Sequence, residues 1–195
     1  MTDYYAPHPR FTIERPLVLV GHPGAGVAAI ARMVSGRTGL TFNDVPRAVE
    51  SRAGRSCARI LIEDGVETLR TLEAAALDQA VRRRPHGVVA VGSGALENDA
   101  VRAATKSAAH LLWVQRPDEV LLDRIRAAIA RAPESVTEFV VSLPTTVEDL
   151  STFLAPRDRV RTESDSILEA ADLHPGQVAT DLLATLDRMI ETTKL

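Results

Sequence analysis

The sequence predicts an α/β fold built on a parallel sheet of five strands, and three observations support this prediction. Short runs rich in valine and leucine alternate along the chain with longer stretches of helical periodicity. A glycine-rich loop joins the first apolar run to the first helical stretch, and a second glycine turn at residues 92–94 follows another run. Strands that alternate with helices pair in parallel, because each helix carries the chain back to the same edge of the sheet.

Five segments are predicted to be strands. Residues 16–20 and 87–91 are continuous apolar runs, which are typical of strands buried on both faces. Residues 111–114 form a third run, whereas 40–42 and 166–168 are shorter and weaker candidates. The central strands of the sheet are therefore expected to be the three long runs.

The predicted helices lie between these strands. Leu69, Leu72 and Leu77 belong to an apolar stripe at helical spacing, which indicates one face packed on the sheet. The predicted helices span residues 27–34, 47–53, 56–63, 66–83, 118–131 and 175–192.

One domain is expected over residues 16–195, preceded by an extended N-terminal tail over residues 1–15 that is polar and contains prolines. Residues 132–146 combine two prolines with mixed polarity and are predicted to form a mobile lid. The first residues lack the apolar core of a signal peptide, and no apolar run is long enough to cross a membrane. We therefore expect a cytoplasmic protein that does not bind membranes.

Charge and cysteine content exclude several functional classes. The net charge of −3 gives no electrostatic reason to expect nucleic-acid binding. The single cysteine, Cys57, rules out an internal disulfide framework and is expected to be a buried, inert thiol. The histidines lack metal-ligand spacing, so a zinc site is not expected.

The loop after the first strand is the most informative stretch of the chain. A phosphate-binding loop reads Gly, four residues, Gly, Lys and then Ser or Thr. Both glycines are present, but Val27 and Ala28 stand in place of the lysine and the hydroxyl that binds Mg²⁺. The backbone N–H groups could still hold an anion, although a tight turn without a ligand stays an alternative. This remnant consists of Gly21, His22, Pro23, Gly24, Ala25, Gly26, Val27 and Ala28.

The chain resembles the shikimate kinase family over about residues 16–187. Residues 53–60 are similar to the family's G-x-S-I-x-x-I-F motif, and residues 69–73 are similar to its F-R-x-x-E motif. Residues 92–94 stand where the family has three glycines. The resemblance implies a three-layer P-loop NTPase fold of the nucleoside-monophosphate-kinase type, with a five-stranded parallel sheet and a lid segment.

The family's functional residues match this sequence only in part. Its substrate-carboxylate arginine falls on Arg70, next to the acidic Glu73, whereas its second substrate arginine falls on Leu154. Its metal-associated aspartate falls on Asp44, a weak metal candidate, and its substrate aspartate on Pro46. Two simpler interpretations stay open: Arg70 and Glu73 as a surface ion pair, and Asp44 as a helix cap.

Together these losses predict a shikimate kinase-like protein that has lost phosphoryl transfer. The resemblance associates it with the aromatic amino acid pathway. This pseudo-kinase would act as a ligand-sensing or protein-interaction module, and no catalytic residue is assigned. No cofactor is expected beyond weak binding of ATP, phosphate or sulfate without Mg²⁺. The remaining arginine would favour an anionic ligand with few hydroxyls, while His22 is expected to be solvated. The candidate pocket residues are Arg70, Glu73, Gly92, Ser93 and Gly94.

Two other functions stay open at this point. The first is an active ATP-dependent small-molecule phosphotransferase, a shikimate kinase or a related enzyme, with rebuilt catalytic residues. Arg32, Arg126 or Arg131 would then replace the missing lysine. The second is a structural subunit that binds no small molecule and acts only through a protein partner.

Overall fold

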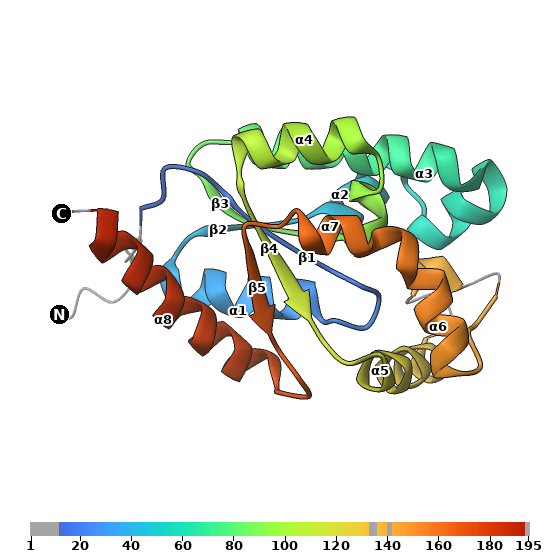
Figure 1. Ribbon diagram of the computed structural model, residues 1–195. Coiled ribbons are helices and arrows are strands. Elements are labelled where there is room, and N and C mark those ends of the chain that lie inside the picture. The colour runs from blue at the N-terminus through green and yellow to red at the C-terminus, as the bar shows by residue number, and fades with distance from the viewer. Residues whose placement is uncertain (1–11, 133–135, 140–141, 194–195) are drawn as a thin grey trace, which may run out of the picture.

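A five-stranded parallel sheet lies at the centre of the computed structural model, which describes residues 12–132, 136–139 and 142–193 (Figure 1). The strands are β1 (Leu17–Gly21), β2 (Thr41–Asp44), β3 (Gly87–Gly92), β4 (His110–Gln115) and β5 (Ser166–Glu169). Their order is β2-β3-β1-β4-β5, so β1 lies in the middle, with β3 and β2 on one side and β4 and β5 on the other. The predicted α/β class and the five-stranded parallel sheet are confirmed.

Helices α1 (Val27–Thr38) and α8 (Pro175–Thr193) cover one face of the sheet, as Figure 1 shows. Alternate strand residues such as Leu19 and Ala90 point to this face and belong to the same core cluster as Ile30 of α1. Gly39 ends α1 in the left-handed conformation, where glycine carries no steric penalty. This layer supports the helix whose first residues follow the glycine-rich loop.

Four helices cover the other face of the sheet. The long helix α3 (Cys57–Arg82) spans both predicted helices of this region. The two halves meet at a kink at Gly65, whose φ is 85°. Trp113 and Val89 point to this face and share a core cluster with Leu69 and Val160. These helices are α2 (Val45–Ala53), α3 (Cys57–Arg82), α4 (Asp99–Ala108) and α7 (Asp158–Thr162).

The remaining elements gather beyond the carboxyl end of the sheet. Helices α5 (Asp118–Arg131) and α6 (Val147–Leu154) lie against each other there, and the 3₁₀ turns η1 (Ser93–Leu96) and η4 (Ala155–Arg157) connect neighbouring elements. The turn η3 (Thr137–Phe139) falls within the predicted lid. Its Phe139 is buried and contacts Phe153 with ring centroids 4.9 Å apart. This part of the predicted lid segment therefore packs on α6, and residues 133–135 and 140–141 lie outside those described.

Three helices, α4, α6 and α7, were not predicted from the sequence, because each is short and lacks a long apolar stripe. Asn98 caps α4 and a Thr146–Asp149 capping box starts α6, and both are local signals that the periodicity does not contain. Most of the predicted tail lies outside the described residues, although Arg15 donates hydrogen bonds to the carbonyls of Lys106 and Ala109. Among the helices described, none has the length and apolar character required to cross a bilayer.

Candidate functional site

The predicted site residues meet at the carboxyl edge of the sheet. Gly21, which ends β1, lies opposite Gly92 of β3 on one side and Val114 of β4 on the other. The glycine-rich loop and the turn at residues 92–94 therefore start from adjacent strands. Open parallel sheets bind ligands in the crevice beyond the carboxyl ends of their strands, so this edge is the natural place for a site.

The backbone of the glycine-rich loop keeps the form of an anion-binding turn. Gly24 and Gly26 adopt φ values of 84° and 80°, which only glycine adopts without strain. The Ala25 N–H donates to the His22 carbonyl over 3.0 Å and closes the turn, and α1 begins at Val27. Within the described chain, the N–H groups of Gly24 and Gly26 donate to no protein acceptor. They are therefore available at a helix N-terminus, where anions bind well.

The side chain at the lysine position turns inward. A Cβ placed on Gly21 would lie 3.0 Å from Cγ2 of Val27, so the valine covers the start of the loop. Val27 and Ala28 are partly buried against the core cluster beneath α1. These two side chains support the loop by packing and offer no charge or hydroxyl to a ligand.

Among the described residues, the one lysine, Lys106, lies too far from the loop to replace the missing one. Lys106 belongs to the last turn of α4, which leads into the amino end of β4. The loop lies at the carboxyl end of the same sheet, so the strand length separates the two. Lys194 lies outside the described residues.

Two arginines that the sequence analysis did not single out hold the loop. The Nε atom of Arg124 donates to the Gly24 carbonyl over 2.9 Å, and its Nη2 lies 3.2 Å from the Cβ position of Gly26. Arg116 is fully buried and donates from Nε to the Ala25 carbonyl over 2.9 Å. Its Nη atoms donate to carbonyls of residues 170–173, so Arg116 ties the loop to the segment after β5.

The arginines suggested as replacements for the lysine are engaged elsewhere. Arg32 stacks over Phe42 with its Cζ 5.3 Å from the ring centroid, near β2. Arg126 donates to the Thr145 carbonyl, and Arg131 donates to the Ala127 carbonyl within its own helix. The arginines that contact the loop are instead Arg116 and Arg124, and neither is among these three. Arg124 lies on the same turn of α5 as the buried Leu121 and Ile125.

His22 is not solvated, contrary to the expectation. Its Nδ1 lies 3.3 Å from the Ser93 Oγ, and its ring meets the fully buried Trp113 edge to face at 4.7 Å. Burial, assisted by the positive charge of Arg157, lowers the pKa of His22 to about 4. A neutral imidazole therefore links the glycine-rich loop to the turn after β3 at neutral pH. Ser93 itself is buried, which gives this contact a fixed position.

Arg70 and Glu73 form a largely buried ion pair, so the surface interpretation of this pair was wrong. Nη1 of Arg70 lies 2.7 Å from Oε2 of Glu73, and their side chains are 19% and 9% exposed. Nη2 of Arg70 lies 2.8 Å from Oε1 of Glu138, which comes from η3. Burial raises the pKa of Glu73, whereas the carboxylates of Glu73 and Glu138 outweigh burial and raise the pKa of Arg70.

A second arginine completes this cluster, so the expectation of a single remaining arginine was wrong. Leu154 ends α6 in the core, but the following 3₁₀ turn η4 brings Arg157 to the site three residues later. Nη1 of Arg157 lies 2.8 Å from Oε2 of Glu138, and its Nε lies 2.5 Å from Oε1 of Glu97. We call Arg70, Arg157, Glu73, Glu97 and Glu138 the arginine cluster.

The turn at residues 92–94 shapes the same cluster. A Cβ on Gly94 would collide with the guanidinium of Arg70, so glycine is needed for the arginine to pack over the turn. Gly92 has open space around its Cβ position, and Ser93 contacts His22 as described. The five predicted pocket residues are thus near one another, joined by Glu97, Glu138 and Arg157, which the sequence analysis missed.

Asp44 acts as a helix cap in this structure. Its Oδ1 accepts a hydrogen bond from the Arg47 N–H over 3.2 Å at the start of α2, and Pro46 follows within the first turn. Across the described residues, no group of three or more His, Cys, Asp or Glu side chains is arranged to hold a metal ion. A metal role for Asp44 stays a prediction. Burial also raises the pKa of the Cys57 thiol to about 12, in agreement with an inert cysteine.

Comparisons with known proteins agree on one family. The family model described as shikimate kinase matches residues 23–187, which is most of the chain. "Shikimate kinase 2" of Escherichia fergusonii is 27% identical over 90% of this chain and 93% of its own length. The shikimate kinase of Thermobifida fusca is 42% identical, but the match spans 46% of this chain and about half (52%) of that protein.

Solved structures show the same fold. A shikimate kinase from Acinetobacter baumannii, solved in complex with shikimate, superposes with a TM-score of 0.78. The match covers 93% of this chain and 95% of that one at 23% identity. The predicted P-loop NTPase fold is confirmed by this likeness and by the strand order. This chain belongs to the shikimate kinase family.

Proposed function

We propose that this protein binds a small carboxylate at the arginine cluster and has lost phosphoryl transfer. One observation carries the proposal: the side chains that follow the second loop glycine, Val27 and Ala28, pack on the core and offer neither charge nor hydroxyl. Phosphoryl transfer depends almost entirely on positioning and on positive charge around the transferred group. Removing one such stabilising group typically reduces the rate by about 10²–10³, and here the metal ligand is missing as well.

The ligand class follows from the charges that the site retains. Two guanidinium groups, from Arg70 and Arg157, face one position from two different elements. Arginine binds carboxylates through paired hydrogen bonds of fixed geometry. Pro46 stands where the family's substrate aspartate would bind hydroxyl groups. A carboxylate on a weakly hydroxylated body is therefore the ligand that suits this site, and a protein that binds without turnover would act as a sensor or as a regulatory subunit.

A second candidate is an active ATP-dependent phosphotransferase, which the names of the relatives favour. The matched proteins of Thermobifida fusca and Escherichia fergusonii are both named shikimate kinases. The guanidinium of Arg124 beside Gly26 is the one observation of this structure that favours the same function. In this candidate, Arg124 supplies the positive charge at the loop, and ATP with Mg²⁺ is the co-substrate.

The deciding experiment measures shikimate phosphorylation with ATP and Mg²⁺, together with ATP titration by calorimetry with and without Mg²⁺. We expect no turnover and weak ATP binding that Mg²⁺ does not improve. A turnover number on the order of 1 s⁻¹, the ordinary range for enzymes, would overturn the proposal. Activity that disappears in Arg124→Ala would then identify the second candidate.

A designed variant tests the cause of the loss. The double variant Val27→Lys with Ala28→Ser restores both missing groups, and we expect it to gain ATP affinity that depends on Mg²⁺. Val27→Met with Ala28→Ser is the matched control, because methionine has a long unbranched chain without the charge. We expect neither variant to phosphorylate shikimate, since Pro46 is unchanged. Equal ATP affinity in both variants would contradict the assigned role of the missing lysine.

A further inference from the structure

Within the arginine cluster, Glu138 holds a position that differs from that of the other two carboxylates. Its Oε1 lies 2.8 Å from Nη2 of Arg70, and its Oε2 lies 2.8 Å from Nη1 of Arg157. Arg70 comes from α3 and Arg157 from η4, so one carboxylate joins two elements that are far apart in the chain. A free carboxylate bound between two arginines would make the same pair of contacts.

The two arginines do not need Glu138 for neutralisation. Glu73 pairs with Arg70 from the same helix, one turn away, at 2.7 Å. Glu97 pairs with Arg157 at 2.5 Å. Glu138 is therefore a third carboxylate beside two guanidinium groups, which leaves the cluster with one excess negative charge. Burial raises the pKa of Glu73, and the nearby charge of Glu138 adds to the rise.

The cluster also has unused hydrogen-bonding capacity. The Nε atom of Arg70 is buried and has no hydrogen-bond partner among the described residues. An unsatisfied buried donor is unfavourable, and a ligand with more than one acceptor atom could satisfy it. Glu138, whose two oxygens already contact the two arginines, leaves this donor without a partner.

We propose that Glu138 is an internal ligand of the Arg70–Arg157 pair. Its carboxylate occupies the position between the two arginines that a free carboxylate would take, and it is displaced when a free carboxylate binds. The inference rests on the proposed carboxylate-binding function and adds the regulation of that site. Phe139, the next residue, is buried against Phe153, so the turn that carries Glu138 is held at the site by apolar contact. Phe153 in turn lies under the guanidinium of Arg157 at 4.7 Å.

The size of the effect follows from competition. A ligand that binds only when Glu138 is displaced has an apparent affinity reduced by the fraction of molecules in which the arginines are free. If that fraction is on the order of one in ten, removing the internal carboxylate strengthens binding about tenfold. Glu138→Gln should keep the fold, because Glu73 and Glu97 still balance the two arginines.

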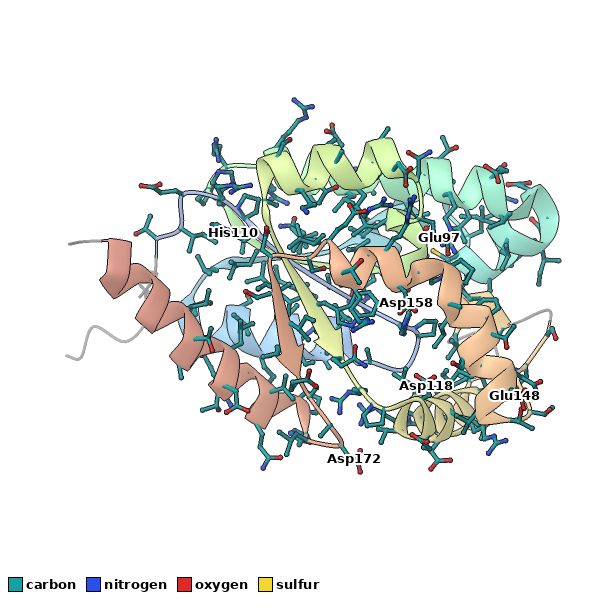
Figure 2. All side chains as sticks on the ribbon, viewed as in Figure 1. Glu97, His110, Asp118, Glu148, Asp158 and Asp172 are labelled. Atoms are coloured by element: carbon teal, nitrogen blue, oxygen red, sulfur yellow. The ribbon has the colours of Figure 1, made fainter. Side chains whose placement is uncertain are left out.

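The test titrates benzoate, without nucleotide, into the wild-type protein, Glu138→Gln and Glu148→Gln by calorimetry. Glu148 is exposed on the first turn of α6, and Figure 2 shows it at the end of that helix remote from Glu97. We expect Glu138→Gln to bind benzoate about tenfold more tightly than wild type, and Glu148→Gln to match wild type. Benzamide, which lacks the charge, should bind none of the three proteins.

Two further variants assign the effect to the arginine pair. Adding Arg157→Gln to Glu138→Gln should abolish the gain. Glu138→Asp keeps the charge but shortens the side chain, so it should show a smaller gain and serves if Glu138→Gln does not fold. Unchanged affinity in a folded Glu138 variant, an equal gain in Glu148→Gln, or a gain that survives Arg157→Gln would overturn the inference.

The outcomes separate this inference from the proposed function. Phosphorylation of shikimate would defeat the proposed loss of transfer and leave the benzoate titration unaffected, because no nucleotide is present. Equal benzoate binding by wild type and Glu138→Gln would defeat the inference and leave carboxylate binding in place.

Discussion

The glycine-rich loop and the arginine cluster lie at the same edge of the sheet, yet they differ in what each has retained. In the loop, the backbone keeps the turn through Gly24 and Gly26, while the lysine and hydroxyl positions are apolar. In the cluster, the chemistry of two guanidinium groups is present, although one of them comes from Arg157 and not from position 154. The loop has the backbone geometry of the motif without its lysine and hydroxyl. The cluster has two arginine side chains, one of which comes from a different position in the chain.

The difference shows which features of the site depend on the fold alone. The loop geometry is needed to join β1 to α1, and Arg116 and Arg124 hold it through backbone carbonyls alone. The loop geometry therefore does not depend on a phosphate contact. The arginine cluster contains two largely buried guanidinium groups, and removing either arginine would leave carboxylates without that partner. Electrostatic balance within the cluster therefore favours keeping both arginines.

The largest expected effect comes from removing Arg157, which tests whether the cluster is held by its own charges. Arg157→Ala leaves Glu97 and Glu138 without their shared partner in a partly buried position. Breaking such a pair typically costs about 3–5 kcal/mol, and chemical denaturation should show a loss of free energy of unfolding near that range. Arg161→Ala is the matched control, because Arg161 is more exposed and its Asp158 partner lies 3.5 Å away. Similar losses in both variants would show that the cluster is no more important than the surface of α7.

A second prediction addresses the contact between the loop and the turn after β3. His22 has a pKa of about 4 in the folded protein against 6.5 for the free side chain. Between these values the unfolded chain binds a proton that the folded protein does not, so stability falls as the pH falls from 6.5 toward 4. This contribution amounts to about 2 kcal/mol at pH 5 relative to pH 7. His22→Gln should remove that part of the pH dependence, measured by denaturation at several pH values. Parallel curves for the two proteins would mean that His22 titrates normally in the fold.

The smallest expected effect on stability comes from replacing Asp44. Two variants at this position distinguish a role as a helix cap from a role as a metal ligand. Loss of a helix N-cap typically costs about 1 kcal/mol, so Asp44→Ala should lower the free energy of unfolding by about that amount. Asp44→Asn keeps an oxygen that can accept the hydrogen bond of Arg47, and its stability should match that of wild type. Stabilisation of the wild type by millimolar Mg²⁺ that both variants lose would instead support a metal site.

Local patterns explain how much of the fold was predictable. The long strands, both halves of α3, and α5 and α8 follow from apolar runs and helical spacing, which are properties of ten to twenty neighbouring residues. The kink within α3 falls at Gly65, where the two predicted helices were separated. The short helices α4, α6 and α7 escaped prediction because they depend on caps and on packing against distant elements.

The candidate site was predictable only where its chemistry is tied to local spacing. The loop, Arg70, Glu73 and the turn at residues 92–94 were identified by motif and order, and the structure places them together. Arg157 and Glu138 carry no local motif, because their roles depend on where η4 and η3 lie relative to α3. Arg124 was likewise one of many arginines until α5 brought it to Gly24.

The sequence by itself determined the fold class, through the periodicity of its apolar residues. It also determined the family, through the resemblance of its motifs, and the absence of a lysine and a hydroxyl at two positions of the loop. The tertiary structure decided which arginines reach the site, which carboxylate lies between them and which histidine is buried. The physical reason is that a guanidinium reaches several ångströms from its backbone. Its partners are therefore chosen by the packing of elements that are distant in sequence.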